Sequence, residues 1–150
     1  RYGVPFVIND DVALAKEIDA DGVHVGQDDM EAGDVRAILG ADKIIGVSAH
    51  NVEEALRAER HGADYLGVGA MFHTGTKLDA EEVSREAAQE ITAAVDIPVV
   101  AIGGINKKNI LELKGTGVDG VALVSAIFGA ENIEEECKTL KALSAEMVQA

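Results

Sequence analysis

The chain has 150 residues, a length that suits one domain with a modest hydrophobic core. Its formal net charge of −14 at pH 7 argues against a nucleic-acid-binding protein and against a protein that binds an anionic membrane surface. Apolar residues make up 47% of the sequence and aromatic residues only 3%, which favours an aliphatic core of parallel strands buried on both faces.

Cysteine usage and hydropathy bear on the compartment. The single cysteine, Cys137, excludes an internal disulfide framework and is consistent with a reducing compartment. No hydrophobic run in the sequence is long enough to span a bilayer, and no segment resembles a signal peptide. We therefore expect a cytoplasmic protein, whose oligomeric state is left open, including a homo-oligomer.

Short apolar runs alternate with helical patterns along the whole chain. The predicted strands are, in order, Val4–Ile8, Gly22–Gly26, Ile44–Val47, Tyr65–Ala70, Pro98–Ile102 and Gly120–Val124. The predicted helices cover about residues 12–18, 35–39, 51–62, 81–95, 106–115 and 132–147. In the fourth strand, Gly67 and Gly69 indicate places where another group packs closely.

An internal repeat introduces three of the strands. Ala20-Asp21-Gly22, Ala63-Asp64-Tyr65 and Val118-Asp119-Gly120 each stand between a helix and the strand that follows it. Each repeat therefore begins a new strand–helix unit, and no linker separates the units into two domains.

Alternating strands and helices predict a parallel sheet, either doubly wound or closed into a barrel. A barrel collects polar residues from the carboxyl end of every strand on one face, whereas an open sheet binds its ligand at one switch point. Polar or glycine residues stand at or shortly after the end of all six predicted strands, so we predict a (β/α)₈ TIM barrel in one domain, residues 1–150. A closed barrel needs eight units, so we expect two N-terminal units to lie outside this chain, which would be the C-terminal three-quarters of the fold.

Two carboxylates follow neighbouring strands. Asp10 comes two residues after the first predicted strand and Asp29 shortly after the second. Carboxylates at adjacent strand ends suit Mg²⁺, which also binds water and phosphate oxygens. The alternative is that Asp10 and Asp11 cap a helix and that Asp29 is an ordinary loop residue.

Three later strand ends suit phosphate. Thr74-Gly75-Thr76-Lys77 offers two hydroxyls and an ammonium around one glycine, or is simply a solvated turn. Gly103-Gly104-Ile105 either presents backbone N–H groups to a phosphate or forms a tight turn. Ser125 begins a short segment that would add N–H groups at the next strand end.

Two further polar residues lie on or after predicted strands. Ser48 either hydrogen-bonds a heterocycle or starts a turn. His24 alternates with two valines, which predicts a packed, hydrogen-bonded histidine on one face of its strand, whereas His73 lies within the polar loop before Thr74.

Six short motifs occur in one order along essentially the whole chain. They are Val-Ile-Asn-Asp-Asp at 7–11, Gly-Val-His-Val-Gly-Gln-Asp-Asp at 22–29, Gly-Val-Ser-Ala-His at 46–50, Thr-Gly-Thr-Lys at 74–77, Ala-Ile-Gly-Gly-Ile at 101–105 and Val-Ser-Ala-Ile at 124–127. In these motifs, their order and their spacing, the chain resembles the thiamine-phosphate synthase (thiamine-phosphate pyrophosphorylase) family.

The resemblance implies a (β/α)₈ barrel that joins hydroxymethylpyrimidine diphosphate to a thiazole phosphate, with release of diphosphate. It implies Asp10 and Asp29 as Mg²⁺ ligands, Asn9 and Lys77 as the catalytic residues that hold the pyrimidine diphosphate, and Ser48 as a pyrimidine contact. The implied thiazole-phosphate site consists of Thr74, Thr76, Gly104, Val124 and Ser125. The bond to diphosphate would break largely before the thiazole nitrogen attacks, so no protein nucleophile is needed.

Two departures from the family pattern qualify these expectations. Ala70 and His73 stand where the family usually has proline, which predicts a looser loop carrying Thr74–Lys77. The family's first two units, which contribute glutamine and lysine contacts to the diphosphate, are absent from the chain, so the polypeptide alone is expected to be inactive.

Other functions remain open at this point. A thiazole tautomerase uses the same barrel without Mg²⁺, but its Asn-Asp-Asp and Gly-Gln-x-Asp motifs are degraded, whereas those motifs are intact here. A non-catalytic phosphate-binding fragment would bind a thiazole phosphate without making product. An aldolase-like enzyme would need a lysine buried on a strand, and no lysine of this chain has that position.

Overall fold

The computed structural model describes residues 2–75 and 82–149. Within this part of the chain, six parallel strands form one sheet in the order of the sequence. The strands are β1 (Val7–Asn9), β2 (Gly22–Val25), β3 (Ile44–Ala49), β4 (Tyr65–Val68), β5 (Val99–Ile102) and β6 (Gly120–Ala122).

Helices follow the strands in alternation. They are α1 (Val12–Glu17), α2 (Ala32–Leu39), α3 (Val52–Arg60), α4 (Arg85–Ala94), the 3₁₀ helix η1 (Ile110–Leu113), α5 (Ser125–Phe128) and α6 (Ile133–Val148). Side chains cap four of these helices by accepting a hydrogen bond from a first-turn N–H, namely Asp11 for α1, Asn51 for α3, Ser84 for α4 and Asn132 for α6.

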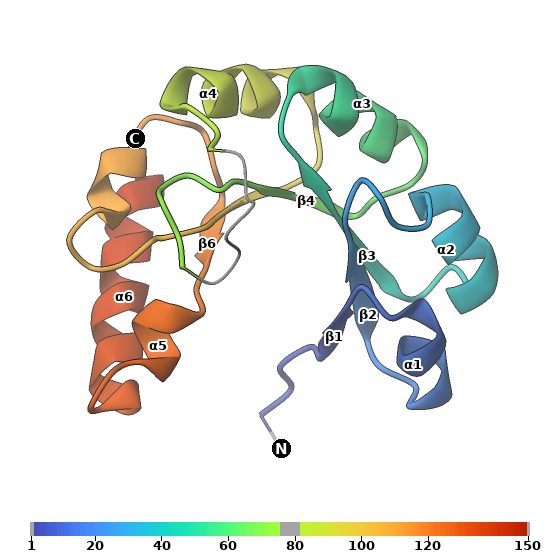
Figure 1. Cartoon of the computed structure of the whole chain (residues 1–150), viewed down its shortest axis with the longest axis horizontal. Helices are drawn as coiled ribbons and strands as arrows, with labels where there is room; N and C mark the ends of the chain where they lie inside the picture. Colours follow the sequence, from blue (N-terminus) through green and yellow to red (C-terminus); the bar gives the residue numbers. More distant parts are fainter. Residues whose placement is uncertain (1, 76–81, 150) are drawn as a thin grey trace.

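The strand order distinguishes a barrel-like sheet from a doubly wound one. A doubly wound sheet reverses direction at a switch point, whereas β1 to β6 follow one another without reversal. Crossovers of one hand that always step in one direction place the helices on one side of the sheet. Figure 1 shows this arrangement, with the helices in an arch outside a curled sheet whose ends are β1 and β6.

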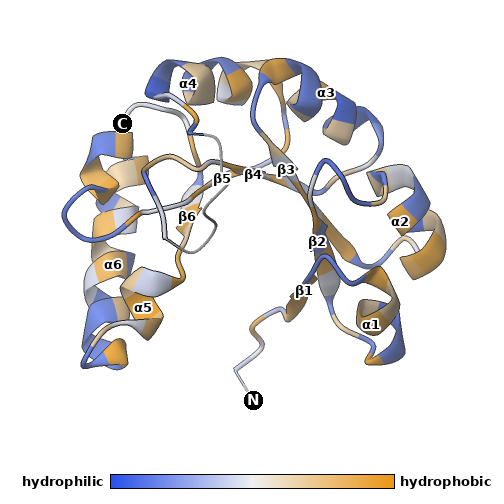
Figure 2. Cartoon of the chain, viewed as in Figure 1, coloured by the Kyte–Doolittle hydropathy of each residue, from blue (hydrophilic) through white to orange (hydrophobic). Residues whose placement is uncertain are grey.

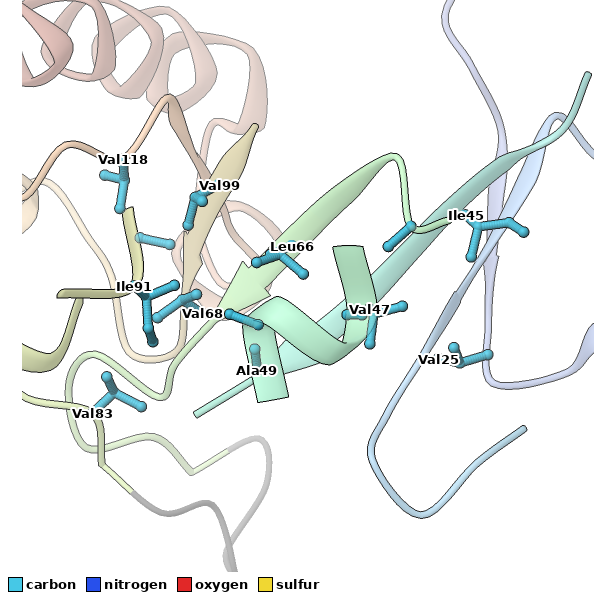
Figure 3. Close-up of a cluster of buried hydrophobic side chains, with 14 of the residues drawn as sticks. Val25, Ile45, Val47, Ala49, Leu66, Val68, Val83, Ile91, Val99 and Val118 are labelled. Carbon is cyan, nitrogen blue, oxygen red and sulfur yellow. The ribbon is translucent and has the colours of Figure 1, made fainter. Parts of the chain in front are cut away.

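The main core lies between the sheet and the surrounding helices. Val25, Val47 and Leu66 occupy neighbouring register positions on β2, β3 and β4 and are buried against the helix side, as Figure 3 shows. Ile91 of α4 is fully buried in the same cluster. Figure 2 shows hydrophobic residues along the strands and hydrophilic residues over much of α3 and α4. No helix in the described part of the chain is long and apolar enough to cross a membrane.

The three repeated aspartates have one structural role. Asp21 Oδ2 accepts a hydrogen bond from the N–H of Phe6, just before β1, at 2.7 Å. Asp64 Oδ2 accepts from the N–H of Ile45 in β3 at 2.8 Å, and Asp119 Oδ2 accepts from the N–H of Val99 in β5 at 2.8 Å. Each aspartate therefore ties the start of the neighbouring earlier strand to the start of its own.

Replacing Asp119 with alanine is expected to lower the free energy of unfolding by about 2 kcal/mol, because the Val99 N–H loses a charged acceptor. Asp119→Asn retains a side-chain carbonyl oxygen and should lose less than half as much. Urea denaturation of both variants measures the difference, and equal losses would show that the hydrogen bond is not the cause.

Several boundaries differ from the sequence-based expectations. The first strand is Val7–Asn9, not Val4–Ile8, because Pro5 has no N–H and residues 2–6 are exposed. α4 begins at Arg85, not near residue 81, because Ser84 caps it and the N–H of buried Val83 bonds Ala70 O at 2.8 Å instead. The helix expected over 106–115 is only the short η1, which neither Asn106 nor Asn109 caps through its side chain.

Candidate active site

Parallel pairing brings the predicted site residues to one edge of the sheet. Asn9 is the last residue of β1 and lies level with His24 of β2, which lies level with Gly46 of β3. Further residues follow the carboxyl ends of their strands and therefore lie at the same edge. These are Asp10 after β1, Asp29 after β2, Thr74 after β4, Gly104 after β5, and Val124 and Ser125 after β6, while Ser48 is the next-to-last residue of β3.

The two aspartates after β1 differ in backbone conformation and in hydrogen bonding. Asp11 Oδ1 accepts a hydrogen bond from the N–H of Leu14 at 2.9 Å and caps α1. Asp10 has a positive φ of 67°, and its N–H donates to His24 O at 2.8 Å. Asp11, and not Asp10, is therefore the N-cap of α1.

Asp29 closes a turn after β2. Its Oδ2 accepts a hydrogen bond from the N–H of Gly26 at 2.6 Å, and the residue is exposed. Among residues 2–75 and 82–149, no cluster of three or more histidine, cysteine or acidic residues could hold a metal.

A hydrogen-bonded trio lies on the concave side of the sheet. Since Val23 and Val25 face the helices, the alternation of a strand places His24 on the opposite face. His24 Nε2 lies 2.9 Å from Ser48 Oγ, and His24 Nδ1 lies 2.9 Å from Tyr65 Oη. The prediction of a packed, hydrogen-bonded His24 is confirmed.

Burial shifts the pKa values of His24 and Tyr65, the two ionisable members of this trio. It lowers the pKa of His24 below its ordinary value, and the negative charge of Asp29 raises that pKa by a smaller amount. Burial also raises the pKa of the Tyr65 hydroxyl, which therefore keeps its proton at neutral pH. The trio is an uncharged network at neutral pH.

A second link supports the backbone at Ser48. Gln27 Nε2 donates a hydrogen bond to Ser48 O at 2.6 Å, and Arg57 Nη2 of α3 donates to Gln27 Oε1. Tyr65 and Arg57 were not predicted from the sequence to belong to this region, and Gln27 was noted only as part of the motif at 22–29. The glycines Gly46 and Gly67 were the available signal for Tyr65, because each lies on a strand beside the His24 ring.

Two glycines shape the turn after β5. Gly103 and Gly104 have positive φ values of 96° and 64°. A Cβ on Gly104 would lie 2.4 Å from His73 O and 2.7 Å from Phe72 O, so only glycine fits against the loop after β4. Asn109 Nδ2 donates to Gly104 O at 2.9 Å, which holds the turn from its other side.

Backbone hydrogen bonds attach the start of the loop after β4 to the end of β5 and the turn that follows it. The N–H of Met71 donates to Ile102 O at 2.9 Å, and the N–H of Phe72 donates to Gly103 O at 3.1 Å. These two hydrogen bonds tie the start of the loop to the turn after β5. His73 is exposed and lies 3.8 Å from a Glu82 carboxylate oxygen. Thr76 and Lys77 lie outside the described residues.

Gly104→Ala is expected to lower the free energy of unfolding by about 1–3 kcal/mol more than Gly115→Ala does, because the new methyl group must displace the loop after β4. Gly115 also has a positive φ, of 82°, but a Cβ there meets nothing within 4 Å. Gly115→Ala therefore reports only the free-energy cost of placing alanine at a positive φ, without a steric clash. Urea denaturation compares the two, and equal losses would contradict the proposed close packing.

Comparison with known proteins places the chain in a family. The family described as thiamine monophosphate synthase matches residues 1–127. The thiamine-phosphate synthase of Clostridium tetani is 52% identical over 140 residues, which are 93% of this chain and 67% of that protein. The thiamine-phosphate synthase of Methanobrevibacter smithii is 54% identical over 132 residues, which are 88% of this chain and 63% of that protein.

A solved structure agrees with the sequence relatives. The thiamine phosphate pyrophosphorylase of Pyrococcus furiosus has a TM-score of 0.89 and 44% identity, covering 98% of this chain and 70% of that one. The chain thus spans about two thirds of the length of the relatives it matches. On the family match, the sequence identity and the shared fold together, the chain belongs to the thiamine monophosphate synthase family.

Proposed function

We propose that this chain forms the active site of a thiamine-phosphate synthase, a transferase that joins hydroxymethylpyrimidine diphosphate to a thiazole phosphate. The observation that carries the proposal is the convergence of polar residues from successive strands on one edge of the sheet. Identity above 50% to several thiamine-phosphate synthases supports it.

The proposal assigns Mg²⁺ to Asp10 and Asp29. Two carboxylates on neighbouring strand ends fit this ion, because Mg²⁺ in phosphate-handling sites is held by one or two carboxylates together with substrate phosphates. Asp29 Oδ2 accepts the Gly26 N–H, which leaves Oδ1 for a ligand. A bound Mg²⁺ would supply positive charge to the diphosphate as its bond to the pyrimidine breaks.

The chain's own residues bind and orient the two parts of the pyrimidine diphosphate. Asn9, at the end of β1, and Lys77 hold the diphosphate, and the Lys77 ammonium stabilises negative charge as the diphosphate departs. Ser48, on the concave side of β3, contacts the pyrimidine. The resulting pyrimidine cation is captured by the thiazole nitrogen, so positioning replaces covalent catalysis.

The thiazole phosphate is assigned to the other half of the same edge. Thr74, Thr76, Gly104, Val124 and Ser125 follow β4, β5 and β6 and would surround the phosphate of the second substrate. The close contact of Gly104 with the loop after β4 supports this assignment, because it brings two of the proposed phosphate-binding segments together.

The cellular setting is part of the proposal. A single cysteine supports a cytoplasmic enzyme, and the net charge of −14 supports small phosphorylated substrates, not nucleic acid, as its partners. A homo-oligomer remains compatible with these observations.

Activity is best tested in a fusion that places two strand–helix units of the Clostridium tetani relative before Arg1, called the eight-unit fusion below. We expect it to convert both substrates to thiamine phosphate, and chelation of Mg²⁺ by EDTA to lower the rate at least about 100-fold. The 150-residue chain alone is expected to show no turnover.

Three outcomes would count against parts of the proposal. Turnover by the chain alone would refute its expected inactivity. Isomerisation of a thiazole phosphate without Mg²⁺ and without thiamine phosphate would favour a tautomerase. Binding of a thiazole phosphate with no product in the fusion would favour a non-catalytic phosphate-binding protein.

A further inference from the structure

The trio of His24, Ser48 and Tyr65 joins three neighbouring strands through side chains alone. His24 of β2 lies between Ser48 of β3 and Tyr65 of β4, with 2.9 Å from each ring nitrogen to its hydroxyl partner. The His24 and Tyr65 rings have centroids 5.4 Å apart. Ser48 is the member nearest the carboxyl edge, where the candidate active site lies.

Two glycines make room for the trio. A Cβ on Gly46 would lie 2.5 Å from His24 Nδ1 and 2.2 Å from Tyr65 Cζ. A Cβ on Gly67 would lie 2.9 Å from His24 Cε1. A side chain at either position would displace the His24 ring. Glycine at positions 46 and 67 is therefore needed for the ring to occupy this place on the sheet.

The hydrogen-bond roles within the trio depend on which His24 nitrogen carries the proton. Among the described residues, His24 Nδ1 is the hydrogen-bond partner of the half-buried Tyr65 hydroxyl. With the imidazole proton on Nε2, Tyr65 donates to His24 Nδ1, and Nε2 donates to Ser48 Oγ, whose own hydrogen is then available for a ligand. With the proton on Nδ1, both hydrogen bonds reverse and the Ser48 hydroxyl donates to Nε2.

We propose that His24 is a positioning residue that holds the Ser48 hydroxyl as a hydrogen-bond donor to a ring nitrogen of the pyrimidine, with Tyr65 fixing the His24 tautomer. The inference rests on the proposed function for the identity of the ligand. A pyrimidine ring nitrogen carries a lone pair and requires a donor, which is the role that the tautomer with its proton on Nε2 leaves to Ser48. Because electron density leaves the ring as the cation forms, this hydrogen bond serves binding of the ground state more than the chemical step.

The tautomer is measured directly by NMR of the 150-residue chain with ¹⁵N-labelled histidine. We expect His24 to carry its proton on Nε2, and we expect Tyr65→Phe to shift it toward a mixture of both tautomers. Tyr2→Phe is the matched control, since Tyr2 is 82% exposed and lies outside the trio. A proton on Nδ1 in the parent chain would overturn the inference and leave the proposed function untouched.

Binding by the eight-unit fusion tests the role of the donor. Glutamine places its amide nitrogen near the position of His24 Nε2, whereas asparagine reaches only as far as Nδ1. We expect the Kd for hydroxymethylpyrimidine diphosphate, measured by calorimetry, to rise less than about threefold in His24→Gln and about tenfold or more in His24→Asn. Tyr65→Phe should raise it about fivefold, with kcat changed less than about twofold.

The outcomes separate this inference from the proposed function. Equal Kd values for His24→Gln and His24→Asn, with native circular dichroism, would overturn the positioning role alone. The expected difference in Kd without any formation of thiamine phosphate would support the positioning role and refute the synthase assignment. A parent fusion that does not bind the pyrimidine would overturn both.

Discussion

Replacing Asp10 with asparagine is expected to lower kcat of the eight-unit fusion about 10²- to 10³-fold, the range seen when one preorganised electrostatic contact is removed from a reacting centre. The substitution removes a negative charge from the proposed Mg²⁺ site and keeps the size of the side chain. Asparagine also tolerates the positive φ of 67° at this position, so the backbone should not change. Steady-state kinetics at several Mg²⁺ concentrations measures the effect and should show a raised Mg²⁺ requirement.

The neighbouring residue provides a matched control for Asp10. Asp11 carries the same charge one position later, and its carboxylate caps α1 through the N–H of Leu14. Because asparagine caps a helix about as well as aspartate does, Asp11→Asn should retain kcat within about threefold. Equal losses in the two variants would indicate a general effect of charge, and wild-type kinetics in Asp10→Asn would remove Asp10 from the site.

Lys77→Ala is expected to lower kcat by about 10²- to 10³-fold with a smaller change in KM. The physical reason is that negative charge on the diphosphate grows as the bond to the pyrimidine breaks, so the ammonium contributes most in the transition state. Lysine offers a compact charge, and Lys77→Arg should therefore recover only part of the rate.

The control for Lys77 is a lysine outside the proposed site. Lys141 is exposed on α6, and Lys141→Ala also removes one positive charge from a protein of net charge −14. Its kinetics should match the parent fusion. A Lys77→Ala variant with unchanged kcat would contradict the assignment of Lys77 to the departing diphosphate.

Much of the fold could be predicted because its signals are local. Parallel strands buried on both faces produce aliphatic runs such as Ile44–Val47, and the side-chain caps Asn51 and Asn132 mark the starts of helices. Asp10 and Asp29 could be placed at the carboxyl ends of β1 and β2 for the same reason, since each lies within four residues of its strand's end in the sequence.

The parts that were missed depend on contacts between distant segments. Tyr65 reaches His24 only because β2, β3 and β4 pair in one register, with Gly46 between the two side chains. Arg57 reaches Gln27 because α3 packs beside the loop after β2, which no local pattern encodes. The late start of α4 likewise reflects the hydrogen bond from Val83 to Ala70.

The proposed function depends above all on carboxylates from neighbouring strands that hold a metal–diphosphate complex at one edge of the sheet. The most direct measurement is an anomalous difference map from crystals of the eight-unit fusion grown with Mn²⁺ and diphosphate, because Mn²⁺ shares the oxygen ligands and octahedral preference of Mg²⁺. We expect one strong peak bonded to carboxylate oxygens of Asp10 and Asp29 and to the diphosphate. A peak bonded elsewhere, or a diphosphate bound at this edge without any metal peak, would contradict the proposed metal site.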